Sequence, residues 1–182
     1  MSTIESRETS AISGDAGLSL IELIIYILLS SLLLSAMAVV LVNSWSTQKD
    51  VASVTQATNR GQVIGSAIER AMRNALDFDV DDATGTELRV RTSLGGNLAC
   101  QAFLLKDGDA RFTTSSGALP TLASDWARWE NGIAQYASTP FFVENGDVVT
   151  YTFDIETDSA PVRFSGEAAA RSTATGVSSP CW

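Results

Sequence analysis

The chain has 182 residues, which is enough for one domain of ordinary size plus an accessory helix. Its formal net charge is -9, from 21 acidic and 12 basic residues, and such an acidic surface disfavours direct nucleic-acid binding by the lone chain. The absence of histidine excludes Ser-His-Asp, Cys-His and histidine-zinc chemistry. We therefore predict no catalytic residues and no enzyme activity; carboxylate-only catalysis is the chemistry that the composition leaves open.

Residues 1–17 form a polar N-terminal segment that is rich in Ser, Thr and Glu. The segment shows no apolar periodicity that could build one face of a helix. We interpret it as a disordered leader.

Residues 18–42 are apolar, small or hydroxylated, with Glu22 and Tyr26 as the exceptions. At about 1.5 Å per residue, a helix of this length crosses a hydrocarbon core of about 30 Å. We predict the transmembrane half of a helix here. One alternative is a plain signal anchor. Another is a removable secretory signal cut at Ala36-Met37-Ala38, which resembles a small-residue cleavage site. It is disfavoured because the apolar run continues beyond that point.

The helical pattern continues through residues 43–76, where apolar and small residues recur at steps of three and four. The predicted stripe consists of Val51, Val54, Thr58, Gly61, Ile64, Ile68, Met72 and Ala75. Charged side chains, among them Arg60 and Arg70, lie off this stripe. We predict one continuous helix from about residue 18 to about residue 76, amphipathic in its second half.

After Asp82 the period of the pattern changes to two, which is typical of half-buried strands. The alternation covers residues 88–91 and 149–155, and a final strand is predicted at residues 161–165. A long helix followed by such strands predicts an α+β fold. In this fold a small antiparallel sheet within residues 77–182 buries the amphipathic stripe.

Two dipeptides predict hairpin turns between these strands. Asp107-Gly108 joins the predicted strands 102–106 and 109–113, and Asn145-Gly146 joins the predicted strands 141–144 and 147–150. Residues 115–140 contain Gly, Pro and Ser breakers, and we predict a loop there with one short helix at most.

The junction between the leader and the apolar segment reads Gly17-Leu18-Ser19-Leu20-Ile21-Glu22. This run resembles the prepilin cleavage motif of type IV pilins and type II secretion pseudopilins, in which a polar leader ends in Gly and Glu is the fifth mature residue. The resemblance implies cleavage after Gly17 by a prepilin peptidase, N-methylation of Leu18 and an assembly role for Glu22. It also implies the pilin fold, a long helix packed on an antiparallel β head.

The position of Glu22 has a physical rationale. A carboxylate at membrane depth costs about 2.5 to 3.5 kcal/mol on insertion scales, so a compensating charge is expected. Cleavage after Gly17 frees an ammonium group on Leu18, one helical turn from Glu22 and accessible to the Glu22 of a neighbouring helix. The cut therefore creates the charge that assembly uses, and the positive end of the helix dipole adds a smaller favourable effect.

The resemblance implies a structural minor pilin or pseudopilin that assembles into a type IV pilus or pseudopilus for motility, adhesion, DNA uptake or secretion. Its partners would be the prepilin peptidase, other pilin subunits, membrane lipid before assembly and, indirectly, the assembly ATPase machinery. Ser31 and Val39 stand where many major pilins carry a helix-loosening Gly and Pro, which favours a minor subunit or a pseudopilin. The alternative is a non-polymerising membrane-anchored binding module, an adhesin or sensor with an exported β head.

The expected location is the cytoplasmic membrane, crossed once, with the N-terminus inside and the head outside. The subunit would then join an extracellular pilus or pseudopilus at the cell surface. The leader carries one basic and three acidic residues, so its charge does not by itself set this orientation.

Cys100 and Cys181 are the two cysteines of the chain. Export of the C-terminal part would carry both to an oxidising space, where a disulfide between them is expected. Such a bridge could stabilise the head by about 4 to 5 kcal/mol in the chain-entropy account. The alternative is a pair of unpaired, buried thiols.

Asp77, Asp79, Asp81 and Asp82 resemble a calcium-binding loop in their alternation. The EF-hand spacing is not met, because Asp82 stands where Gly is needed and Leu88 stands where the bidentate Glu should be. We therefore prefer a solvated turn after the helix, with calcium as the alternative. No other cofactor is expected.

Trp126 and Trp129 are two aromatic residues in the predicted loop. They could form an adhesive patch for sugars or a partner subunit. Such a pair more often covers a small core, and we predict packing.

Overall fold

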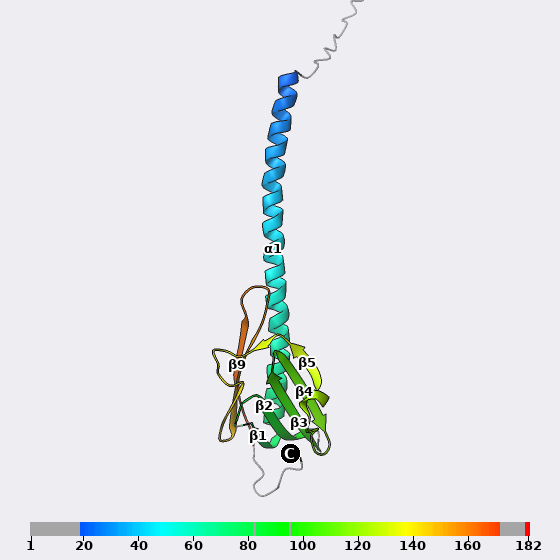
Figure 1. The fold of residues 1–182 in the computed structure, drawn as a ribbon, viewed down its shortest axis with the longest axis vertical. Coiled ribbons are helices and arrows are strands. Elements are labelled where there is room, and N and C mark those ends of the chain that lie inside the picture. The colour runs from blue at the N-terminus through cyan, green and yellow to red at the C-terminus, as the bar shows by residue number, and fades with distance from the viewer. Residues whose placement is uncertain (1–18, 82, 95, 172–180) are drawn as a thin grey trace, which may run out of the picture. The chain divides into compact units, whose positions relative to one another are not determined.

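The computed structural model describes residues 19–81, 83–94, 96–171, 181 and 182. Within these residues there are one long helix, one short 3-10 helix and nine strands. Their order is α1 (Leu20–Arg73), β1 (Ala75–Val80), β2 (Glu87–Leu94), β3 (Asn97–Lys106), β4 (Asp109–Ser115), η1 (Ala123–Asp125), β5 (Ala127–Asn131), β6 (Ile133–Ala134), β7 (Phe142–Asn145), β8 (Val148–Ile155) and β9 (Val162–Ala169). The predicted α+β fold is therefore confirmed (Figure 1).

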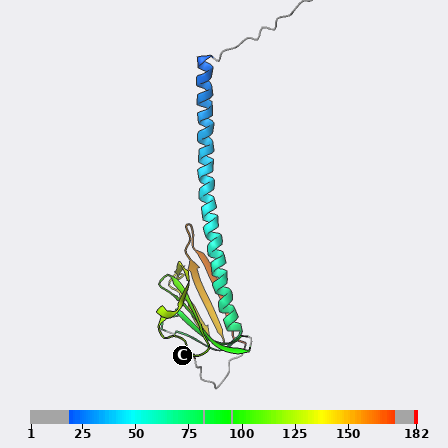
Figure 2. The ribbon, with the colours of Figure 1, turned by 90° about the vertical axis from the view of Figure 1, so that its right-hand side faces the viewer.

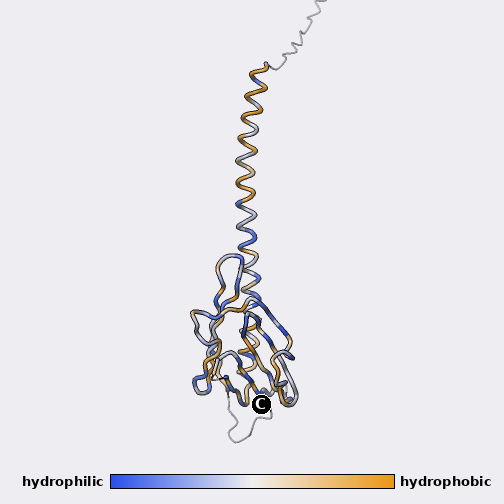
Figure 3. The backbone as a smooth tube through the Cα atoms, viewed as in Figure 1, coloured by the Kyte–Doolittle hydropathy of each residue, from blue (hydrophilic) through white to orange (hydrophobic). Residues whose placement is uncertain are grey.

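The chain divides into two compact units, Met1–Ser46 and Thr47–Trp182. In the first unit, the described residues are Ser19 and the first part of α1. Each of them is exposed except Glu22, which is half-buried. Apolar residues dominate this part of the helix, as its hydropathy colouring shows (Figure 3). A helix that is apolar on all sides needs an apolar environment such as lipid or other helices.

In the second unit, the rest of α1 buries one face against the strands. The buried residues of the helix are Ala57, Gly61, Ile64, Gly65, Ile68, Ala71 and Met72. The predicted stripe is thus confirmed from Gly61 to Met72, but it is wrong at Val51, which is 60% exposed. Figure 2 shows the orange C-terminal strands beside this part of α1.

The helix ends three residues earlier than predicted, at Arg73. Asn74 forms a turn there, and its side-chain amide donates a hydrogen bond to the carbonyl oxygen of Arg70 over 2.7 Å. The next residues form strand β1, in which Asp77 pairs with Arg91 and Asp79 with Arg89 of β2. The prediction of a solvated turn is therefore wrong at Asp77 and Asp79. The physical reason is that apolar Leu76, Phe78 and Val80 alternate with these acids, as in a half-buried strand.

Strands β1 to β5 form one antiparallel sheet in chain order. The predicted hairpin between β3 and β4 is confirmed: Lys106 pairs with Asp109. Asp107 and Gly108 both have positive φ, of 51° and 84°, as the tight turn requires. Sheet formation extends into the predicted loop, because β5 pairs with β4. The loop prediction for residues 115–140 is wrong at β5 and β6, and correct about one short helix, η1.

A second antiparallel sheet is centred on β8. Strand β9 pairs along one edge of β8, while β7 and β6 pair with successive parts of its other edge. The hairpin predicted at Asn145-Gly146 is confirmed, with a shift of one residue: Asn145 pairs with Val148, so Gly146 and Asp147 form the turn. The β residues thus form two sheets where the sequence predicted one.

The main core lies between the second part of α1 and the two sheets. It contains Ile64, Ile68 and Met72 from the helix, together with Phe103 of β3 and Phe153 of β8. A smaller cluster lies on the other face of β3. It consists of Cys100, Ala102, Leu104, Leu119, Trp126 and Cys181. Alternate residues of β3 therefore serve two separate clusters, which is why four consecutive residues of this strand are buried.

Candidate functional site

The apolar N-terminal part of α1 is an unusual surface for a protein in water. Between residues 20 and 42 its large apolar side chains are 47% to 77% exposed. Within the described residues, α1 is the one helix long and apolar enough to cross a membrane, judged by length and composition. Exposed apolar surface of this extent marks a site for lipid or for other protein.

Glu22 is the one charged residue in this apolar segment. The hydroxyl group of Tyr26 donates a hydrogen bond to Glu22 Oε1 over 3.0 Å. Residues four apart lie on the same face of a helix, so Tyr26 satisfies one acceptor of the carboxylate from within its own helix. This contact was not predicted from the sequence, although the spacing of the two residues could have revealed it. The carboxylate can accept a further hydrogen bond, or pair with a positive charge, from another molecule.

Gly17 and Leu18, the predicted cleavage residues, lie outside the described residues. The backbone just after them is helical, because the amide of Leu23 donates a hydrogen bond to the carbonyl oxygen of Ser19 over 3.1 Å. Glu22 therefore lies in the first turn of α1. A carboxylate at this position interacts favourably with the positive end of the helix dipole.

Cys100 and Cys181 form a disulfide, as predicted, with their Cα atoms 5.5 Å apart. The bridge closes a sequence separation of 81 residues. Both cysteines are buried in the smaller cluster, and the carbonyl oxygen of Cys181 accepts a hydrogen bond from the Leu119 amide over 2.9 Å. The bond thus fastens the end of the chain to β3.

Trp126 and Trp129 pack in different places. Trp126 is buried in the smaller cluster, and its indole nitrogen donates a hydrogen bond to the carbonyl oxygen of Pro120 over 2.9 Å. Trp129, on β5, packs with Phe112 and Phe103 at ring distances of 5.7 and 6.4 Å, against the main core. The predicted packing role is confirmed, and the two indoles do not share one surface patch.

The acidic residues proposed as a calcium site have other partners. Asp79 lies 3.9 Å from the Arg89 guanidinium. Asp81 accepts hydrogen bonds from the Thr84 hydroxyl and the Ala83 amide, and the Thr84 bond is the main reason why the pKa of Asp81 lies below its ordinary value. Asp82 lies outside the described residues. Among those that are described, no three acidic or sulfur side chains are placed to hold a metal ion.

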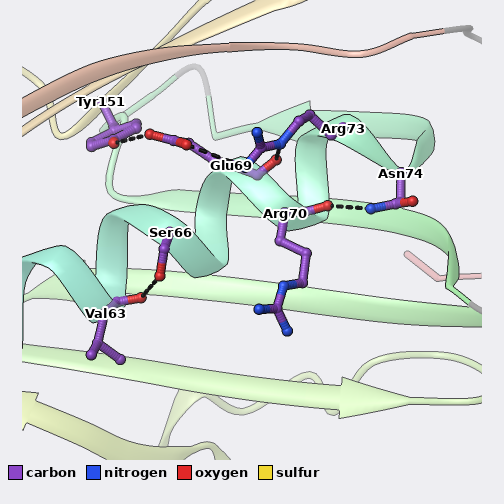
Figure 4. Close-up of polar contacts among 7 residues, drawn as sticks. All are labelled: Val63, Ser66, Glu69, Arg70, Arg73, Asn74 and Tyr151. Atoms are coloured by element: carbon purple, nitrogen blue, oxygen red, sulfur yellow. Dashed lines mark hydrogen bonds and ion pairs between the residues drawn. The ribbon is translucent and has the colours of Figure 1, made fainter.

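Glu69 connects α1 to the second sheet, a contact that was not predicted from the sequence either. The hydroxyl of Tyr151 donates a hydrogen bond to Glu69 Oε1 over 3.1 Å, and the Arg73 guanidinium lies 3.3 Å from Oε2 (Figure 4). Burial, followed by the hydrogen bond and charge of Glu69, raises the pKa of Tyr151 to about 12. The spacing of Glu69 and Arg73 could have predicted their pair, whereas Tyr151 is too distant in sequence.

No family model, no curated protein and no solved structure matches this chain. The features that bear on function are an N-terminal apolar helix that could span a membrane, two antiparallel sheets, and a disulfide that ties Cys181 to β3 of the first sheet.

Proposed function

We propose that the chain is a structural minor pilin or pseudopilin subunit, which is cut after Gly17 and assembles into a pilus or pseudopilus. The observation that carries this proposal is the run from Gly17 to Glu22, placed directly before a helix with exposed apolar residues on every side. The polar leader, the Gly, the apolar start and the Glu all occur in the order that the prepilin motif requires.

The proposed mechanism begins with cleavage in the membrane. The peptidase would free the amino group of Leu18 and methylate it, leaving an ammonium group near the start of α1. Glu22 has its Tyr26 hydrogen bond but no positively charged partner among the described residues, so the new ammonium group of the same or a neighbouring copy supplies one. A charge pair in an apolar medium is favourable only when its hydrogen-bonding groups are satisfied, and Tyr26 contributes to this requirement.

The exposed apolar part of α1 would serve two environments in turn. Before assembly it lies in lipid, and after assembly the same residues pack against neighbouring helices in the core of the fibre. The helix is continuous through Ser31 and Val39, and the Ser31 hydroxyl donates a hydrogen bond to the Leu28 carbonyl oxygen over 2.9 Å. This continuity supports a minor subunit or a pseudopilin, because many major pilins carry helix-loosening residues at these positions.

The disulfide supports the proposed orientation. Disulfides persist in oxidising compartments, so the head that carries Cys100 and Cys181 belongs outside the cytoplasm. The subunit would first be a single-pass protein of the cytoplasmic membrane and then part of an extracellular fibre. Its partners would be the prepilin peptidase, other pilin subunits and, indirectly, the assembly ATPase.

Sequencing of the mature N-terminus tests this proposal directly. The expected mature protein begins at Leu18 and carries a methyl group on its amino nitrogen, which mass spectrometry detects. Replacing Gly17 with Leu should leave the full precursor in the membrane, since the peptidase needs a small residue before the cut. A mature form that retains residues 1–17, or that begins beyond Glu22, would contradict the proposal.

A membrane-anchored binding module that never polymerises is the second candidate. It is favoured by a cavity of about 250 Å³ on the outer side of the first sheet, lined by Arg89, Trp126 and Trp182 among others. Aromatic and charged groups around a cavity of this size can bind a small polar ligand. Such a module would keep its membrane helix without the Leu18 terminus, so the same sequencing experiment separates the two functions.

A further inference from the structure

A cavity of about 350 Å³ lies near the C-terminal end of α1. It is lined by Ser66, Arg70, Arg73, Asn74 and Arg171, and we name it the arginine pocket. Three of these five residues are arginines and none is acidic, although acidic residues outnumber basic ones by 21 to 12 in the chain. A neighbouring cavity is lined by Glu69 and Glu167, and Arg73 and Arg171 line it too, so the positive charge of the arginine pocket borders an acidic surface.

Two of the three guanidinium groups have no ion pair among the described residues. Arg73 is paired with Glu69 at 3.3 Å, but Arg70 and Arg171 are exposed and unpaired there. In Figure 4 the only dashed line at Arg70 reaches its carbonyl oxygen, which accepts the hydrogen bond from Asn74. The pocket thus has two cationic groups available to a ligand.

The helix dipole explains only part of this cluster. Arginines in the last turn of a helix, such as Arg70 and Arg73, are common because they interact favourably with its negative end. Arg171 belongs to a different segment, just after β9. The amide of Ala170 holds that segment by donating a hydrogen bond to the Asp147 carbonyl oxygen over 2.8 Å. The third guanidinium therefore needs another explanation.

A complementary acidic surface lies in the loop between β8 and β9. Glu156 and Asp158 are exposed, and neither has an ion pair among the described residues. We name residues 156–158 the acidic loop. The loop is held in place because the Glu156 amide donates a hydrogen bond to the Gly132 carbonyl oxygen over 2.8 Å. A hydrogen bond from the Thr157 hydroxyl to the Ala160 carbonyl oxygen, over 2.9 Å, also orders it.

The two charged surfaces lie at different levels along α1. The acidic loop shares a cavity with Ser53, Gln56 and Arg60, whereas the arginine pocket includes Ser66 and Arg70. Arg60 is already paired with Glu130 at 2.6 Å. At about 1.5 Å per residue, Gln56 and Arg70 are about 20 Å apart along the helix. Copies anchored in one membrane are parallel, so a two-fold axis between them would place each surface at the level of its own kind and bring like charges together. A head-to-tail contact brings opposite charges together, and repeated contacts of that kind generate an open helical filament.

We propose that the arginine pocket of one copy binds the acidic loop of a second copy of this chain, with Arg70 and Arg171 pairing with Glu156 and Asp158. This inference rests on the proposed function. Exposed charge pairs contribute little by themselves in water, so a free small anion would bind weakly. Copies that are already held together by their apolar helices bring the loop to the pocket at a high effective concentration. The contact requires a subunit that occurs in adjacent copies, which excludes a single-copy position at the tip.

Cysteine cross-linking between two tagged copies of the full chain tests the contact. One copy carries Ser66→Cys in the lining of the pocket and the other carries Ser159→Cys beside the acidic loop; both serines are exposed, and all charges are kept. The native cysteines are paired with each other, so they do not compete. We expect a cross-linked dimer in oxidised membranes. The matched control pairs Ser66→Cys with Ser124→Cys, which is exposed beside the exposed Asp125, and should give no dimer.

Charge reversal in the same assay tests the electrostatic pairing. Arg70→Glu with Arg171→Glu in the first copy should lower the dimer yield about fivefold. Glu156→Arg with Asp158→Arg in the second copy should do the same, and combining the two reversed copies should restore the yield. Restoration cannot arise from misfolding of either variant, because both are present in the restored pair.

Three cross-linking results would overturn the inference: no dimer above the Ser124→Cys control, a yield unaffected by charge reversal, or no restoration in the swapped pair. Saturable binding of inorganic phosphate to the full chain without the cross-link would also overturn it, since the pocket would then serve a small anion. Normal processing at Leu18 and normal fibres in the absence of the cross-link leave the proposed function standing. Absence of Leu18 processing would instead remove the proposed function itself.

Discussion

Gly61 of α1 lies directly against the ring of Phe164 of β9: a Cβ atom at Gly61 would be 2.1 Å from both Cε2 and Cζ. The helix can approach the second sheet this closely only because residue 61 has no side chain. Phe164 in turn stacks on Phe153 at a ring distance of 5.3 Å, so the contact continues into the main core.

Replacing Gly61 with Ala should destabilise the head. The added methyl group forces the Phe164 ring to move, and overpacking of this kind costs about 1 to 3 kcal/mol. Ala has a better helix propensity than Gly by up to about 1 kcal/mol, which offsets part of this cost. The expected net loss in the free energy of unfolding is therefore smaller than the overpacking cost alone. Denaturant unfolding of the detergent-solubilised chain measures it. Gly117→Ala is the control, because nothing lies within 4 Å of a Cβ at Gly117. Equal stability of the two variants would refute the close contact.

Replacing Glu22 with Leu should allow cleavage but impair incorporation into fibres. The change removes the carboxylate that we expect to pair with the freed amino group, while the segment stays apolar. Quantifying the variant in sheared fibres and in the membrane fraction gives the result. Tyr26→Phe, which removes only the hydrogen bond to Glu22, should be incorporated far better than Glu22→Leu. Wild-type incorporation of Glu22→Leu would remove the assembly role of this carboxylate.

Removing the disulfide should weaken the head substantially. The double variant Cys100→Ser with Cys181→Ser is expected to lose about 2 to 5 kcal/mol of stability, the usual cost of deleting a native bridge. Thermal unfolding with and without a thiol reductant provides the measurement. Reductant should destabilise the wild-type chain and leave the double variant unchanged. A reductant effect of the same size on both proteins would mean that the bridge is not its target.

The stability of the head should fall at high pH through Tyr151. The pKa of this phenol is raised from 10.0 to about 12, so the folded chain keeps the proton to higher pH than the unfolded chain does. The stabilisation is complete below the unfolded pKa and is lost as the pH rises through the folded value. The free energy of unfolding should therefore fall more steeply between these values for the wild type than for Tyr151→Phe. Parallel pH profiles would show that Tyr151 carries no such linkage.

Local patterns in the sequence determined the long helix, its apolar first half, the buried stripe from Gly61 to Met72 and both hairpins. These features depend on periodicity and turn chemistry within about ten residues, so one segment contains its own signal. The same reasoning failed at Asp77 and Asp79, where the polar members of an alternating strand were interpreted as a turn. The motif at Gly17 to Glu22 could likewise be identified without a structure, because its residues are adjacent.

Only the tertiary structure decided how the strands divide into two sheets, which side of β3 Trp126 and Trp129 cover, and which charges meet. Tyr151 reaches Glu69 across 82 positions of the chain, and Arg171 joins Arg70 at one cavity. Such contacts depend on strand register and on the close approach of α1 to the second sheet. Neither is encoded in any short segment, since register arises when one whole face of a strand is buried against distant residues.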